Sequence, residues 1–285
     1  MIGLRAQGSA GIGAAAYRGR VGRIALLMLL AVLAGCATRQ PSDAAVPPFA
    51  RQPYEPFDRA AAVAIAEREW RLFDRPVRDD PPGAASAKAT GEKAERAPGL
   101  WQRIGEYWWL GLGGEDWQRR WTGKHDEHGR VFPADRDGDY AWSAAFVSYV
   151  MRMAGAGPRF PYSSAHSEYI NAARKAADGH IAGARLWAER PDLYAPQPGD
   201  LICQGRGGAR QIRFEDLPAG RFPSHCDIVV AVTPQEIAVI GGNVDDTVAM
   251  KHVPTTPEGR LATRDRRIVD SRYPWFVVVR VLYEQ

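Results

Sequence analysis

The sequence has few cysteines, no long apolar run and no motif for a nucleotide, a flavin or a metal ion. Only three of its 285 residues are cysteine, so it can form at most one intrachain disulfide. Its longest uninterrupted apolar run, residues 24–34, is too short to span a bilayer comfortably. We therefore expect no cofactor and no metal, and we read the apolar run as part of a targeting signal.

The chain also has no excess of basic residues once residues 1–35 are left out of the count. The formal charge is +4, with 37 basic and 33 acidic residues, but residues 1–35 contain four arginines and no acid. Without those four arginines the chain has 33 basic and 33 acidic residues and is neutral. The charge balance therefore gives no support for a nucleic-acid partner. A content of 45% hydrophobic and 25% charged residues is ordinary for a globular protein.

The amino terminus has the pattern of an export signal. Three arginines, at positions 18, 20 and 23, precede the apolar run, which ends in Leu33-Ala-Gly-Cys36. This ending resembles the bacterial lipobox. The resemblance implies that residues 1–35 are a lipoprotein signal peptide and that Cys36 is the lipidated amino terminus. The alternative is a signal-anchor helix with a cysteine there by chance.

The resemblance to lipoproteins also implies a location. Residue 37 is alanine and not aspartate, which in such lipoproteins favours transfer to the outer membrane. We expect the protein at the periplasmic face of the outer membrane, attached to the bilayer through its lipid.

Composition divides the rest of the chain into a tether, a satellite segment and one domain. Residues 36–57 are polar and rich in proline, as in a disordered tether. Residues 58–98 combine a helix, predicted at 60–73, with a loose stretch from residue 76 onwards. Residues 99–285 form the main domain.

The domain is organised around residues 139–152, which predict a turn that runs directly into a buried helix. Apolar side chains follow the spacing of a helix with one wide apolar face, and Gly155 ends it. Ser143 lies in its first turn, next to unpaired backbone N–H groups and the positive end of the helix dipole. The serine either caps the helix or takes part in chemistry.

Helices are predicted before strands along the domain. Helical periodicity occurs at residues 100–110, 143–152 and 165–177, and five short β-rich runs follow at 201–203, 227–232, 236–240, 247–251 and 275–283. This order predicts an α+β fold in which helices pack on a small antiparallel sheet or half-barrel. A long loop, residues 204–224, separates the first two predicted strands.

Four motifs, taken together in their order along the chain, resemble those of the papain-like NlpC/P60 and CHAP superfamily of peptidoglycan amidases. They are residues 142–147 (Trp-Ser-Ala-Ala-Phe-Val), residues 198–200 (Pro-Gly-Asp), His225 and Asn243. The resemblance implies a papain-like fold that acts on peptidoglycan or its stem peptides, with Ser143 as nucleophile, His225 as base and Asn243 as the group that orients the base. Together with the lipobox, the motifs also resemble the bacterial lipoproteins of the DUF2272 group.

The superfamily has cysteine at the position of Ser143. A helix amino terminus and a histidine can populate a thiolate, whereas a serine needs a true general base and a formed oxyanion hole. Three hypotheses stay open: an active Ser-His-Asn hydrolase, an inactive binding module for peptidoglycan or protein, and a scaffold protein. Asp227 is a rival orienting group, and His166 is a second candidate base.

Several other patterns leave alternatives open. Cys203 and Cys226 could form a disulfide in an oxidising periplasm or remain two buried thiols. The tryptophans at 101, 108, 117, 121 and 142 could pack in the core or line a groove that stacks on a sugar or a peptide, and Trp142 could belong to either. His125 and His128 lack a third metal ligand, and residues 135–139 lack the later positions of a calcium loop, so we expect no metal.

Overall fold

The computed structural model describes residues 56–80, 93–179 and 181–284. The signal peptide, Cys36 and the tether up to residue 55 lie outside these residues. The described chain is a mixed α and β protein, and its helices are α2 (Arg59–Leu72), α3 (Leu100–Gly111), α4 (Ser143–Met153) and α5 (His166–Gly179). The strands are β1 (Leu186–Glu189), β2 (Leu201–Gly205), β3 (Ser224–Val232), β4 (Glu236–Val244), β5 (Thr247–Pro254) and β6 (Trp275–Val281).

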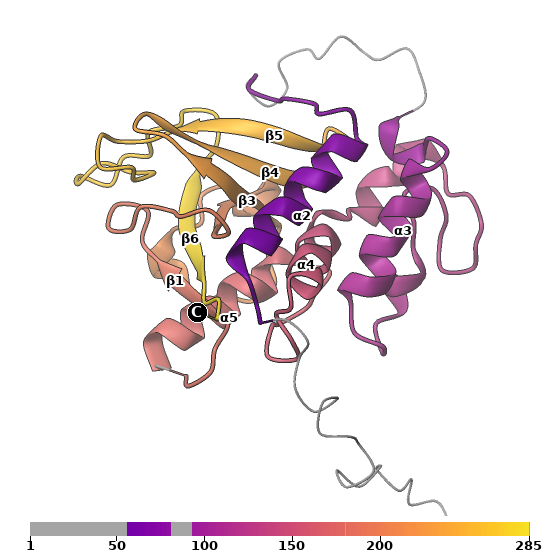
Figure 1. Cartoon of the computed structure of the whole chain (residues 1–285), viewed down its shortest axis with the longest axis horizontal. Coiled ribbons are helices and arrows are strands. Elements are labelled where there is room, and N and C mark those ends of the chain that lie inside the picture. Colours follow the sequence, from indigo (N-terminus) through magenta and orange to yellow (C-terminus); the bar gives the residue numbers. More distant parts are fainter. Residues whose placement is uncertain (1–55, 81–92, 180, 285) are drawn as a thin grey trace, which may run out of the picture. The chain divides into compact units, whose positions relative to one another are not determined.

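The six strands form one antiparallel sheet in the order β1-β6-β2-β3-β4-β5. The last strand, β6, therefore lies between β1 and β2, while β2 to β5 follow one another as neighbours (Figure 1). The pairing is irregular between Cys203 and Gln204 on β2 and between Gly241 and Val244 on β4. Such bulges bend a strand and redirect its side chains.

Helix α4 is the central element of the fold. Every residue from Ser143 to Met151 is buried, because the helix packs on α3, on α2 and on strands β3 and β4. Figure 1 shows α4 between the sheet and α3. Gly155 follows the carboxyl end with a φ of 91°, a conformation that favours glycine. An added Cβ there would also lie 3.0 Å from the carbonyl oxygen of Pro56.

The two faces of the sheet bury separate apolar clusters. The larger cluster joins the helices to one face of the sheet and includes Phe146, Ile228 and Val277. The smaller cluster lies on the other face and includes Val229, Val239 and Trp275. Residues that alternate along a strand belong to opposite faces, which explains why β3 and β6 read as almost continuous apolar runs.

The predicted α+β class is confirmed, and the five predicted strands correspond to β2 through β6. The sequence does not predict strand β1, because it is only four residues long and pairs with β6, 89 to 95 residues further along the chain. In the part of the chain that the structure describes, no helix combines the length and apolar character needed to cross a bilayer.

Candidate functional site

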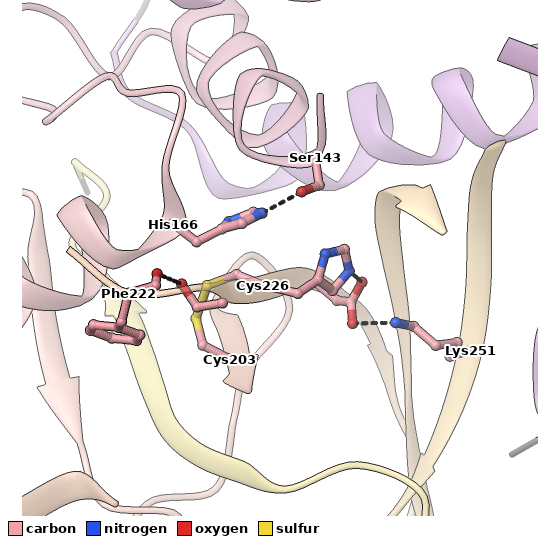
Figure 2. The surroundings of a disulfide bond; sticks show 9 residues. Ser143, His166, Cys203, Phe222, Cys226 and Lys251 are labelled. Atoms are coloured by element: carbon pink, nitrogen blue, oxygen red, sulfur yellow. Dashed lines mark hydrogen bonds and ion pairs between the residues drawn. A yellow bond between two sulfur atoms is a disulfide. The ribbon is translucent and has the colours of Figure 1, made fainter. Parts of the chain in front are cut away.

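Ser143 is the first residue of α4, and its hydroxyl points at a histidine. The N-cap position belongs to Trp142, and no side chain caps the helix there. The Oγ atom of Ser143 lies 2.8 Å from Nε2 of His166 (Figure 2). The serine is nearly buried, with 6% of its surface exposed. Its hydroxyl is therefore directed at an imidazole and does not cap the helix.

His166 is the first residue of α5, so the bond joins the amino termini of two helices. Two further bonds hold these helix starts together. The hydroxyl of Tyr169 donates to the carbonyl oxygen of Ala144 at 2.6 Å, and the backbone N–H of Ser163 donates to Oγ of Ser148 at 3.1 Å. The separation of serine and histidine is thus set by side-chain contacts of α4 with the start of α5 and the turn before it, while α5 itself packs on β1, β6 and β3.

A second polar group lies beside this pair on neighbouring strands. Nε2 of His225 on β3 lies 2.9 Å from Oδ1 of Asp227, and Oδ2 of Asp227 forms an ion pair with Nζ of Lys251 on β5 at 2.7 Å. All three side chains are almost completely buried. The ring centres of His166 and His225 are 5.3 Å apart. The serine–histidine pair and the histidine–aspartate–lysine group therefore share one buried polar region.

The Nδ1 atoms of the two histidines are buried, and neither has a hydrogen-bond partner in the described part of the chain. Nε2 of His166 faces Ser143, and Nε2 of His225 faces Asp227. Each ring therefore has one nitrogen that is engaged and one that is buried without a partner.

Burial determines the charge states of these groups. Burial lowers the pKa of His166 well below its usual 6.5, and the neighbouring His225 lowers it further. Burial also lowers the pKa of His225, although Asp227 opposes that shift. Burial would raise the pKa of Asp227, but Lys251 and His225 outweigh this effect and hold it below the usual 3.8. At neutral pH both imidazoles are therefore neutral and the carboxylate is ionised.

A cavity of about 360 Å³ opens onto Ser143 and His166. Its walls come from the segment before α4, from the turn before α5 and from the end of the long loop, and they consist of Ala141, Ser143, Ser164, Ala165, His166, Arg221, Phe222, Pro223 and Ser224. The loop of residues 204–224 therefore forms one wall of the cavity and leaves it open.

The contacts in the structure differ from those expected for a Ser143–His225–Asn243 triad. Ser143 bonds to His166, the second candidate base, and no hydrogen bond joins Ser143 to His225 among the described residues. Asp227, the rival orienting group, contacts His225. No bond to either histidine is recorded for Asn243 in the described ranges. Asn243 lies at the β4 bulge with a φ of 55°, and Gly241 is the β4 residue whose backbone faces the His225–Asp227 pair.

Trp142 belongs to the core. Its indole is 1% exposed and donates to Oε2 of Glu95 at 2.8 Å. Burial raises the pKa of Glu95 to about 8, although the bond from the indole opposes that shift. Trp142 also packs near Phe73 and Tyr107. Its contribution to the site is to fix the start of α4. Of the other tryptophans, Trp108 and Trp121 are buried, whereas Trp117 is 57% exposed.

Cys203 and Cys226 form a disulfide between directly opposite positions of β2 and β3. Figure 2 shows the disulfide, which joins β2 to β3 at the residue that follows His225. His125 bonds to Thr122, and His128 contacts Glu127. Within the described ranges, no group of three or more His, Cys, Asp or Glu side chains is arranged to hold a metal ion.

Sequence reasoning missed Lys251 and Arg221. Lys251 carried a usable signal, because strand alternation places it on the same face as Ala249 and Val253, and a lysine on a buried face requires a partner. Arg221 carried no local signal. It becomes notable only through its place in the wall of the cavity.

The fold and the site together define an α+β protein with a buried serine–histidine pair at the meeting point of two helix amino termini. The chain belongs to the DUF2272 family, described as an uncharacterized protein conserved in bacteria, and the match covers residues 95–281. No curated protein and no solved structure matches the chain.

Proposed function

We propose that this protein is a serine-dependent hydrolase of peptide amide bonds in the bacterial cell wall, with Ser143 as nucleophile and His166 as general base. The 2.8 Å contact between Ser143 Oγ and His166 Nε2, at the wall of an open cavity, is the observation that carries the proposal. A nucleophile and a base must lie within hydrogen-bond distance for proton transfer.

The charge states support this division of roles. A neutral His166 has a free lone pair on Nε2, which accepts the proton of the Ser143 hydroxyl as Oγ attacks the substrate carbonyl carbon. The resulting imidazolium then gives that proton to the departing amine as the C–N bond breaks. Water, activated by His166 in the same way, hydrolyses the acyl-enzyme and returns the serine to its starting state.

The amino terminus of α4 supplies the means to stabilise the oxyanion. The first backbone N–H groups of a helix have no acceptor within the helix, and they lie at the positive end of its dipole. Ser143 and Ala144 are the first two residues of α4, so their N–H groups are among these unpaired donors. A carbonyl oxygen that gains negative charge during attack is stabilised by donors placed in this way.

His225 is the group that completes the orientation of the base in this mechanism. When Nε2 of His166 accepts a proton from serine, its Nδ1 carries hydrogen and needs an acceptor. When Nε2–H of His225 donates to Asp227, the Nδ1 of His225 is free to accept. Both Nδ1 atoms are buried without partners, and the ring centres are 5.3 Å apart. We infer that the adjacent His225 ring supplies the acceptor for the Nδ1–H of His166.

The amino-terminal export signal and the order of the motifs support a cell-wall substrate. The export signal with Cys36 favours a periplasmic protein, anchored by lipid to the outer membrane. The order of residues 142–147, 198–200 and 225 resembles that of the papain-like NlpC/P60 amidases. The antiparallel sheet packed on a central helix that begins with the proposed nucleophile is consistent with that resemblance.

An inactive peptidoglycan-binding module of the same fold is the second candidate. The observation that favours it is the near-complete burial of both reacting side chains, with 6% of Ser143 and 3% of His166 exposed. Serine in place of cysteine also removes the more reactive nucleophile.

The experiment incubates the full chain in detergent with purified peptidoglycan and measures released soluble peptides by mass spectrometry. Loss of the serine oxygen in Ser143→Ala should reduce release by about 10³-fold or more, because the nucleophile acts as a unit with its base. Ser224→Ala is the matched control: it removes a hydroxyl from the same cavity whose recorded bond is to Phe222, and it should retain activity.

Two results would separate the candidates. Release that is unchanged in Ser143→Ala would exclude Ser143 as the nucleophile. Binding of peptidoglycan without any release, equal in the wild type and in Ser143→Ala, would favour the binding module.

A further inference from the structure

The walls of the cavity beside Ser143 carry a positive charge and no negative charge. Among the residues that form its walls, Arg221 is the one that carries a permanent charge, and none of them is an aspartate or a glutamate. The other polar groups of the walls are hydroxyls and the imidazole of His166. A ligand in this cavity therefore meets a positive charge and hydrogen-bond donors, with no carboxylate to repel an anion.

The backbone around Arg221 is held in place from both sides. The N–H of Ala219 donates to the side-chain oxygen of Asn171 on α5 at 2.9 Å. On the other side, the N–H of Arg206 donates to the carbonyl oxygen of Pro223 at 3.0 Å. The same helix α5 carries His166 at its start. The position of the Arg221 backbone relative to the reacting pair is thus fixed by direct hydrogen bonds.

The guanidinium of Arg221 has no carboxylate partner among the described residues, unlike other arginines nearby. Arg190 and Arg266 both pair with Glu215, and Arg213 pairs with Asp216. Arg221 is exposed at the wall of the cavity, so its guanidinium is available to a ligand there. Such a group binds a carboxylate through two parallel hydrogen bonds, which gives both strength and orientation.

A second arginine, Arg206, adds positive charge in the same region. The backbone of Arg206 adjoins Pro223 in the cavity wall, and no ion pair of Arg206 is recorded in the described ranges. Its positive charge acts on both His166 and His225. The opposing acid, Asp227, is already paired with His225 and Lys251. Arg206 therefore adds positive charge near the two histidines, although its own side chain lines a neighbouring pocket.

We propose that the cavity selects peptides that carry a carboxylate close to the reacting carbonyl, and that Arg221 binds this carboxylate. The proposal rests on the proposed function for its reaction, but the recognition itself is a binding property. Substrates with an amidated or otherwise neutral group at that position would bind more weakly, because the arginine would stay unpaired.

The test measures binding to the Ser143→Ala chain, which cannot turn over, by calorimetry or by NMR titration. One pair of probes is trialanine with a free terminal carboxylate and trialanine amide. A second pair is Ala-Glu-Ala amide and Ala-Gln-Ala amide, which moves the carboxylate to a side chain. Because hydrogen bonds to charged groups contribute strongly, we expect at least about a tenfold preference for the carboxylate member of one pair.

Substitution assigns that preference to one residue. Arg221→Gln, combined with Ser143→Ala, should abolish the preference. Arg213→Gln is the matched control, because Arg213 is an exposed arginine of the same long loop that does not line this cavity, and it should leave the preference intact. Equal binding of both members of each pair, or a preference that survives Arg221→Gln, would overturn the proposal.

The outcome is separable from that of the proposed function. A carboxylate preference without peptidoglycan hydrolysis would leave Arg221 as a recognition residue of a binding module. Hydrolysis without any carboxylate preference would support the enzyme and reject the role of Arg221.

Discussion

At the scale of single residues, the charge state of His166 determines when the proposed enzyme can work. Burial and the neighbouring His225 hold the pKa of His166 well below 6.5. A base acts only in its neutral form, and a depressed pKa extends that form to lower pH. The acidic limb of kcat/KM should therefore lie below pH 6.5, with the rate still near its plateau at that pH. A pH–rate profile with released peptide as readout checks this expectation.

A substitution tests the cause of that shift. The positive charge of Arg206 contributes to the low pKa of His166, so Arg206→Gln should move the acidic limb to higher pH. Arg210→Gln, at an exposed position of the same loop, is the control and should leave the limb in place. An acidic midpoint at or above pH 6.5 in the wild type would contradict the assignment of His166 as the base.

The same shift has a consequence for stability. The folded protein keeps His166 neutral at a pH where the unfolded chain already binds a proton. Between the folded pKa and 6.5 the unfolded state therefore holds more protons, and the free energy of unfolding falls as the pH is lowered through this window.

At the scale of elements, strands β3, β4 and β5 meet around the carboxylate of Asp227. Gly241 on β4 has no room for a side chain, since an added Cβ would lie 1.9 Å from Oδ1 of Asp227 and 3.0 Å from Nε2 of His225. Gly241→Ala must therefore displace the His225–Asp227 bond. We expect a loss of about 1–3 kcal/mol in the free energy of unfolding. We also expect a fall in kcat, because His225 could no longer orient His166.

Urea unfolding and peptide release measure these two effects. Gly208→Ala is the matched control, because nothing lies within 4 Å of its added Cβ and its φ is not positive, so both quantities should stay near the wild-type values. A Gly241→Ala protein with wild-type stability and kcat would show that the His225–Asp227 bond is not needed.

The elements and the site differ in how far the sequence could predict them. Helix α4 and strands β3 and β6 follow from apolar pattern alone, which is a local property. The pairing of Ser143 with His166 depends on contacts between the start of α5 and α4, such as Tyr169 to Ala144. No local pattern encodes those contacts. Motif order therefore favours His225 as the base, whereas in the structure His166 is the histidine that bonds to Ser143.

Among the described residues Asn243 makes no bond to either histidine, and the cause is again a feature that local sequence does not show. A regular strand would alternate its side chains from Gly241 onwards, but the bulge between Gly241 and Val244 and the left-handed φ of Asn243 break that alternation. Asparagine adopts this conformation more readily than most residues. The sequence shows the asparagine without showing the bulge in which it lies.

At the scale of the whole molecule, the disulfide stabilises the long loop and suits an oxidising compartment. Cys203 and Cys226 enclose the loop that contains Arg221 and much of the cavity wall, with a sequence separation of 23 residues. A bond that closes a loop of this length stabilises a protein by about 3 kcal/mol in the chain-entropy account. Disulfides persist in oxidising compartments, which agrees with the expected periplasmic location.

The disulfide prediction combines variants with a reducing agent. The double variant Cys203→Ala, Cys226→Ala should lose about 3 kcal/mol in urea unfolding. Reductant should lower the stability of the wild type towards that of the variant, whereas the variant itself should not respond. The reduced protein should also lose carboxylate selectivity before it unfolds globally, because Arg206 and Arg221 both lie in the released loop. Wild-type stability that does not change on reduction would show that the bond does not hold this loop, and Arg221 would then depend on the Asn171 contact alone.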